Sequence, residues 1–508
     1  MSISESWGNK MFLLLVLAFS IDPALDYLGL DRADLAFDKC WVEDDTFRLD
    51  IIEYFLDEQP LELADSIDVW GKRGLCTPLS LFVDNWLGFF DIRSKDYDFR
   101  SVVKMLETTN ALVDKSLTGL TGKELSTLLM TAPVFLLDED DTLGDTLKGA
   151  LHRYFGVPVD TSIEVTEDSL LNMLAGWKNA VLKCLPCLLD FVVSVDSFSL
   201  PQRDVPGVEG EIIGADSTEW GWVVIGGRGE NTYTGNFAFI LDLGGDDVYR
   251  VWGGLPFGCK VSVVVDHSGN DEYISRLFGV GSGIFGVSII YDRCGDDFYS
   301  GGVGSFGVGF CGAGVVIDGS GNDVYVGGQF SVGAGFYGVG MVVDSSGNDT
   351  YRIDDWGEGL GLTQGIGVLV DKAGNDLYYA GGKEEHNPLL MEDYFGFAQG
   401  FGMGFRPRAG GGIGVLIDGG GSDHYCGGTF VQGTSYWYSL GVLYDAGGND
   451  FYDAVEYAQG AGIHLSIGGL VDVCGKDHYF SRYGPSQGEG HDFSLGLLWD
   501  KAGDDVYV

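Results

Sequence analysis

Paired aspartates recur through the second half of the chain at a spacing that suits hydrogen bonding or cation binding. The octapeptide pattern Asp-x-x-Gly-x-Asp-x-Tyr occurs ten times. Its copies begin at Asp242, Asp266, Asp292, Asp318, Asp344, Asp371, Asp418, Asp445, Asp472 and Asp500. An aspartate that opens a turn can accept hydrogen bonds from backbone amides two and three residues further on. Rows of carboxylate oxygens are also the ligands that Ca²⁺ prefers.

The charge of the two aspartate columns must be offset if consecutive copies stack on one another. Carboxylates about 4.8 Å apart repel each other by roughly 3 to 4 kcal/mol at an effective dielectric constant of about 20. Two ways of offsetting this charge stay open: hydrogen-bonded turns without metal, or a bound cation. The candidate ligands of a cation are Asp242, Asp247, Asp266, Asp271, Asp292, Asp297, Asp318, Asp323, Asp344, Asp349, Asp371 and Asp376. A third column, directly before the second aspartate, contains Lys476, which argues against a cation row through that coil.

These turns resemble the calcium-binding glycine-aspartate turns of RTX-type parallel β-rolls, whose unit is Gly-Gly-x-Gly-x-Asp-x-aliphatic-x. Residues 244–249, Gly-Gly-Asp-Asp-Val-Tyr, come nearest to that unit. The period here is 24 to 28 residues rather than nine, and tyrosine replaces the aliphatic residue. The resemblance covers the turns alone, and it implies Ca²⁺ as a cofactor.

A second group of chemically capable residues is confined to the last copies of the repeat. Trp437, His464 and Asp492 each stand eight residues before the next leading aspartate, so adjacent coils would place them side by side. The full set of candidate ligand-binding residues is Arg406, Arg408, Tyr436, Trp437, His464, His491 and Asp492. Arginines, an aromatic platform, two histidines and an aspartate could bind an anionic sugar or perform acid-base catalysis. An ordinary polar edge with hydrogen-bonded histidines is the alternative.

The short repeat also predicts the scaffold that must position these residues. A fixed period near 26 residues is too short for a propeller blade and favours a β-solenoid. With a degenerate copy at residues 226–233, we expect a right-handed parallel β-helix of about eleven coils of 24 to 28 residues. The repeated tyrosines should face inward, each hydroxyl needing a partner. The two residues before each leading aspartate are apolar, so that sheet should be covered on both faces. An insertion lies near residues 383–398, and the step of 47 residues that contains it is the longest.

Outside the repeats, the pattern of apolar residues changes. Residues 21–205 carry helical apolar patterns and are expected to form an α-helical domain, followed by the solenoid over 206–508. The helical domain is the simplest cover for the outer face of the solenoid. Residues 1–20 could be a signal peptide, because residues 11–19 form an apolar run of suitable length. The protein would then be extracellular or part of the cell envelope, and cytoplasmic otherwise.

Composition narrows the function further. The formal charge of -45, from 75 acidic and 30 basic residues, excludes a general nucleic-acid binder, since phosphate contacts need clustered Lys and Arg. The sequence favours a non-enzymatic scaffold or binding module for a polysaccharide or another cell-surface ligand, stabilised by Ca²⁺ if the cation hypothesis holds. The chain could form a homo-oligomer through the flank or end of the solenoid. The alternative is a carbohydrate-active enzyme, a polysaccharide lyase or hydrolase, with its site on the C-terminal coils.

Overall fold

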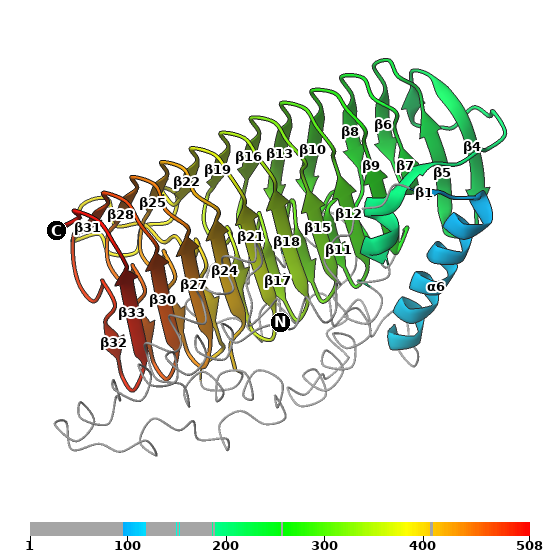
Figure 1. The fold of residues 1–508 in the computed structure, drawn as a ribbon. Coiled ribbons are helices and arrows are strands. Elements are labelled where there is room, and N and C mark those ends of the chain that lie inside the picture. The colour runs from blue at the N-terminus through cyan, green and yellow to red at the C-terminus, as the bar shows by residue number, and fades with distance from the viewer. Residues whose placement is uncertain are drawn as a thin grey trace, which may run out of the picture.

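The repeats form a parallel β-solenoid of about ten turns, which appears in Figure 1 as a rod of stacked strands. The computed structural model describes residues 95–117, 149, 152, 185, 188–255, 258–406 and 410–508. Each regular coil contributes short strands to three sheets, as the glycine-punctuated apolar runs predict. The prediction of a parallel β-solenoid is thus confirmed, with about ten turns where about eleven coils were expected. The expected signal segment and most of the expected helical domain lie outside the described residues.

The first sheet carries the repeated tyrosines and is called the tyrosine sheet. Its strands are β3 (Val208–Glu209), β6 (Thr232–Gly235), β8 (Val248–Val251), β10 (Glu272–Leu277), β13 (Phe298–Val303), β16 (Val324–Gly327), β19 (Thr350–Ile353), β22 (Leu377–Ala380), β25 (His424–Gly427), β28 (Phe451–Ala454), β31 (His478–Ser481) and β34 (Val506–Tyr507).

The second sheet leads into the first aspartate of each motif and is called the aliphatic sheet. Its strands are β4 (Ile212–Thr218), β5 (Gly221–Gly226), β7 (Phe237–Leu241), β9 (Val261–Val265), β12 (Val287–Tyr291), β15 (Ala313–Ile317), β18 (Val339–Asp344), β21 (Ile366–Asp371), β24 (Ile413–Asp418), β27 (Leu440–Asp445), β30 (Ile467–Asp472) and β33 (Leu495–Asp500). The pairs β3–β6 and β4–β5 at the start of the rod are antiparallel, and the later pairs in both sheets are parallel.

The third sheet is shorter and is called the glycine sheet. Its strands are β11 (Ser282–Ile284), β14 (Val308–Phe310), β17 (Ala334–Phe336), β20 (Leu360–Gly361), β23 (Gly402–Met403), β26 (Ser435–Tyr436), β29 (Gly462–Ile463) and β32 (Gly490–His491). It packs so closely on the aliphatic sheet that a Cβ atom on Gly309 would lie 2.2 Å from the carbonyl oxygen of Val339. Only glycine fits at such a contact, which accounts for part of the unusual glycine content.

Register converts the sequence repeat into columns of identical residues. Tyr273 pairs with Tyr299, and Asp344 pairs with Asp371 in the neighbouring coil. Across the 47-residue step, Asp371 still pairs with Asp418, so the insertion does not shift the register between the two coils. A change of one residue in this register would turn every inward side chain outward.

The tyrosines stack inside the rod, as predicted. Rings in adjacent coils have centroids 4.4 to 5.2 Å apart and planes nearly parallel, and the ten tyrosines from Tyr233 to Tyr479 are completely buried. They share one core with the inward aliphatic column that includes Ile240, Val316 and Leu443. Burial of this apolar surface stabilises the rod by about 25 cal/mol per Å².

The outer face of the aliphatic sheet is also buried, as its second apolar column predicts. Leu241, Val265 and Val471 belong to a second core cluster and are fully buried. At the N-terminal end of the rod, α6 (Phe99–Leu117) lies beside this face in Figure 1, and its residues Val102 and Leu106 join the same cluster. The prediction that a segment preceding the solenoid covers this face is therefore confirmed for these coils.

Residues on both sides of α6 in the sequence strengthen this contact. Strands β1 (Lys95–Asp96) and β2 (Val195–Ser197) form a small parallel sheet. Phe191 and Phe198 each pack edge-on against Phe239 of β7, with ring centroids 5.9 Å apart. Arg293 in the solenoid pairs with Asp196 at 2.9 Å. Within the described part of the chain, no helix is both long and apolar enough to cross a membrane.

Candidate functional site

In nine of the ten motifs the first aspartate has both carboxylate oxygens occupied by hydrogen bonds; the exception among the described residues is Asp472, whose Oδ1 has no donor. In one coil, Oδ1 of Asp318 accepts from the backbone N–H of Ser320 at 3.2 Å, and Oδ2 accepts from the hydroxyl of Tyr299 at 2.7 Å. The tyrosine belongs to the preceding coil. The same pattern holds for Asp371, which accepts from the backbone of Ala373 and the hydroxyl of Tyr351. The hydrogen-bonded turn, one of the two answers that the sequence left open, is therefore present in this column at every position except Asp472.

In eight of the ten motifs the second aspartate has a hydrogen-bond donor for only one of its two carboxylate oxygens. Oδ1 of Asp323 accepts from the backbone N–H of Asp297 at 2.6 Å, which links one coil to the next. Its Oδ2 is buried and has no hydrogen-bond donor among the described residues. The same orphan Oδ2 occurs in eight coils, at Asp271, Asp297, Asp323, Asp349, Asp376, Asp423, Asp450 and Asp477. We call these eight residues the orphan row; each is at most 3% exposed.

Buried carboxylates in such a row resist ionisation. Burial, together with the charge of the neighbouring aspartates, raises the pKa of Asp323 to about 9 and that of Asp349 to about 8. Groups of three aspartates from two adjacent coils, such as Asp297, Asp318 and Asp323, bring their ligand oxygens within 4.8 Å of one another. Charges gathered this closely away from water require either protons or a cation to offset them.

The first coil shows that a neutral amide can replace a second aspartate. Asn231 occupies the equivalent position in the degenerate copy of the motif, and its backbone N–H donates to Oδ1 of Asp247 at 2.6 Å. Its side-chain amide donates to Oδ2 of Asp242 at 3.0 Å. An asparagine therefore fits the turn while bringing a donor where the orphan row has none.

Lys476 does not lie on the orphan row. It belongs to a separate surface column, in which Asn322, Asn348 and Asn375 form a ladder of exposed amide hydrogen bonds. The Lys476 side chain is 70% exposed, while the adjacent Asp477 continues the buried row. Lys476 therefore does not interrupt the row of buried second aspartates, because neighbouring residues of this turn point to different sides.

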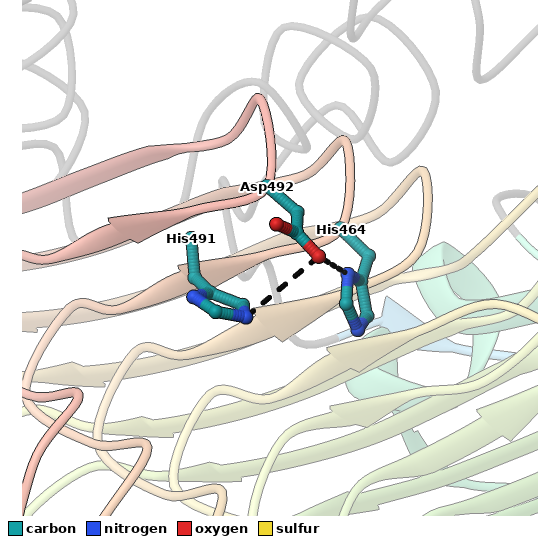
Figure 2. Close-up of side chains that lie close together, drawn as sticks. All are labelled: His464, His491 and Asp492. Carbon is teal, nitrogen blue, oxygen red and sulfur yellow. Dashed lines mark ion pairs between the residues drawn. The ribbon is translucent and has the colours of Figure 1, made fainter.

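The C-terminal polar residues meet as the spacing predicts (Figure 2). The backbone N–H of Trp437 donates to Ile463, and that of His464 donates to His491, so successive coils are in register. Nδ1 of His464 lies 2.8 Å from Oδ2 of Asp492, and Nε2 of His491 lies 3.7 Å from the same oxygen. The side chains of His491 and Asp492 are 44% and 58% exposed, so the group is open to solvent. We call these three residues the His-His-Asp cluster.

Aromatic and cationic side chains border the His-His-Asp cluster. The ring of Tyr436 meets His464 edge-on at 5.1 Å between centroids, and the guanidinium of Arg406 lies 5.4 Å from the ring centroid of Trp437. Burial and the nearby charge of Arg406 lower the pKa of His464, although Asp492 opposes this shift. Trp437 itself is only 3% exposed, so it supports the site rather than offering an aromatic platform. Arg408 lies outside the described residues.

The glutamine column of the C-terminal coils is structural. Nε2 of Gln459 donates to the carbonyl oxygens of Tyr452 and Phe480, both at 3.1 Å, and Gln432 makes equivalent bonds one coil earlier. Gln432 and Gln459 are both fully buried. These amides tie adjacent tyrosine strands together and do not present a surface to a ligand.

The insertion contributes a cluster that the sequence analysis missed. Nδ1 of His386 lies 3.0 Å from Oδ2 of Asp393 and 3.1 Å from Oε1 of Glu456, and the hydroxyl of Thr429 donates to Asp393. A cavity of about 300 Å³ lies beside it, with Tyr379, Tyr394, Asp453 and Arg482 among its lining residues. The histidine and aspartate seven residues apart in the insertion were the only sequence signal.

Comparison of the chain with models of protein families, with curated proteins and with solved structures finds no match in any of the three. The fold and the sites place the protein in a structural class, parallel β-solenoids with buried aspartate columns. The function of the protein is therefore inferred from the geometry of this chain.

Proposed function

We propose that this protein is a calcium-stabilised β-solenoid scaffold that acts as a binding module outside the cell or in the cell envelope. The observation that carries the proposal is the orphan row: eight buried carboxylate oxygens that lack hydrogen-bond donors among the described residues. An uncompensated buried carboxylate costs several kcal/mol, and a row of them adds mutual repulsion. A divalent cation between coils offsets both effects.

The donor chemistry favours calcium over other ions. The groups formed by consecutive coils, such as Asp266, Asp271 and Asp292, offer carboxylate oxygens alone. Hard oxygen ligands select Ca²⁺ or Mg²⁺, and Ca²⁺ accepts irregular geometry more readily. Extracellular modules bind Ca²⁺ with dissociation constants of roughly 10⁻⁴ to 10⁻³ M, a range suited to the medium outside the cell.

The scaffold role is supported by the regularity of the rod. The tyrosine stack, the glutamine column and the hydrogen-bonded leading aspartates all serve the structure. A right-handed coil with a helical N-terminal region completes the proposed architecture. The outward edge near the His-His-Asp cluster and the cavity beside the insertion are the surfaces that we assign to a polysaccharide or cell-surface ligand.

Equilibrium dialysis of the chelator-stripped full chain against labelled Ca²⁺ tests the calcium proposal. We expect several ions per chain, with fewer in the Asp323→Asn variant. The Asp296→Asn variant removes an exposed carboxylate and is the matched control; it should retain the full number. Binding of less than one ion per chain at millimolar calcium would remove the proposal.

A carbohydrate-active enzyme is the second candidate. The 2.8 Å contact between His464 and Asp492 favours it, because a carboxylate that orients an imidazole is a common acid-base arrangement. Release of reducing or unsaturated ends from acidic polysaccharides, abolished in His464→Asn, would support this activity. Binding of such polysaccharides without cleavage would support the scaffold instead.

A further inference from the structure

The histidines of the C-terminal coils create a site with donor chemistry unlike that of the aspartate columns. His464 comes from the turn after β29, and His491 and Asp492 come from the end of β32 and the turn that follows it in the next coil. Their three ligand atoms lie within 4.8 Å of one another, and the close-up in Figure 2 shows both rings flanking the carboxylate. We propose that the His-His-Asp cluster binds a divalent transition-metal ion of the Zn²⁺ type. This inference is independent of calcium in the orphan row.

The distances are close to those of a coordination sphere. Zn²⁺ binds nitrogen at about 2.0–2.1 Å, so two ligands of a tetrahedral site lie about 3.4 Å apart. The contact of His464 with Asp492 is 2.8 Å, and that of His491 with the same oxygen is 3.7 Å. They differ from the tetrahedral spacing by about 0.6 Å and about 0.3 Å, which rotations of the half-exposed His491 and Asp492 side chains can supply.

The ligand set selects the ion. Two imidazoles and one carboxylate suit Zn²⁺, Ni²⁺, Co²⁺ and Cu²⁺, whereas Ca²⁺ prefers oxygen alone. The set also leaves coordination positions open on the solvent side, since His491 and Asp492 are half exposed. Arg406 is the nearby cation that acts on His464, and it opposes metal binding electrostatically while favouring an anionic ligand on the bound ion.

Fold-sparing substitutions are available at both turn positions. His464 and Asp492 have φ values of 56° and 55°, in the left-handed region that asparagine tolerates better than most residues. Asp492→Asn also keeps an oxygen that can accept from His464 while removing the charge. His478→Asn is the matched control, because His478 is an exposed histidine on β31 of the adjoining sheet. His386→Asn tests the other histidine cluster.

The experiment titrates Co²⁺ into the chelator-stripped full chain and follows visible absorption, with Zn²⁺ as competitor. Millimolar Ca²⁺ is present to compete for any site made of oxygen ligands alone. We expect one ion per chain, displaced by Zn²⁺, in the parent protein and in His478→Asn. The affinity for Co²⁺ should fall by at least about tenfold in His464→Asn and Asp492→Asn. Loss of a residue that only supports a metal ligand lowers metal affinity by roughly 10–100-fold, and loss of the ligand itself should cost at least as much.

Circular dichroism of each variant shows whether it has folded, and the two ligand variants provide independent tests. Absence of Co²⁺ binding to the parent protein would overturn the proposal. So would unchanged binding in folded His464→Asn and Asp492→Asn, or a loss confined to His386→Asn, which would place the metal at the insertion.

Discussion

Replacing Asp297 by asparagine should change stability in opposite directions with and without calcium. Asp297 belongs to the orphan row and is 2% exposed, and burial is the main cause that raises its pKa to about 7. In the calcium-free protein above that pH, the folded state must carry this buried charge. The amide of asparagine carries none, and Asn231 demonstrates that an amide fits the turn.

The magnitude follows from the pKa shift. The rise of the Asp297 pKa from 3.8 to about 7 corresponds to at most about 4 kcal/mol of destabilisation of the folded state. An unfolding entropy of about 2.1 cal/mol/K per residue, over a cooperative unit of about 300 residues, converts this to roughly 6 °C in Tm. Because the folded pKa is raised, the penalty is absent below about pH 4 and grows until the pH passes about 7. The gain from Asp297→Asn should therefore be largest at about pH 8 and small at about pH 4.

Calcium should reverse the order of stability. When the cation binds, the carboxylate becomes a ligand, so Asp297→Asn should melt below the parent protein in millimolar calcium. Differential scanning calorimetry in EDTA and in calcium measures both states. Asp296→Asn, one residue earlier and exposed, is the control and should leave both temperatures nearly unchanged. Destabilisation by Asp297→Asn in EDTA and calcium alike would refute the reasoning.

Two further pairs of variants test the packing. Tyr378→Phe removes the hydroxyl that donates to Asp418 at 2.8 Å and should cost about 1.5–3 kcal/mol in urea unfolding. The adjacent Tyr379→Phe, on the half-buried outer face, should change stability by less than about 0.5 kcal/mol. Equal losses of stability in the two variants would contradict the stabilising role of the Tyr378 hydroxyl. Gly309→Ala should destabilise the rod by at least about 1–3 kcal/mol, because its Cβ would collide with backbone. Gly229→Ala, with no atom within 4 Å of the new Cβ, should be tolerated, and similar melting of both glycine variants would show that the contact relaxes.

The columns of the solenoid were predictable because a fixed period determines which residues stack. The inward tyrosines, the doubly buried aliphatic strand and the alignment of Trp437, His464 and Asp492 all follow from counting residues between motifs. The partner of each tyrosine was not predictable in the same way. For most of the column it lies in the next coil, 19 residues away for Tyr299 but 40 for Tyr378, whereas Tyr479 and Tyr507 donate to the leading aspartates of their own coils. No single spacing therefore marks the partner.

The difference between the two aspartate columns could not be predicted from the sequence either, because both positions are aspartate in every regular copy. Turn geometry directs one toward tyrosine hydroxyls and leaves the other with an unpaired oxygen. The pairing of His386 with Glu456 depends on the path of the insertion across the rod, which its residue types do not determine. Direction of side chains within a turn is the missing information in both cases.

Thermal unfolding of the full chain, first in EDTA and then with added Ca²⁺ at about pH 8, tests most directly whether a cation offsets the orphan row. A ligand that binds only the folded state at about 100 times its dissociation constant stabilises it by roughly 2.7 kcal/mol per site. Several sites should therefore raise Tm by well over about 4 °C, given the entropy above. An unchanged Tm would contradict the calcium-stabilised solenoid and leave shared protons to neutralise the row.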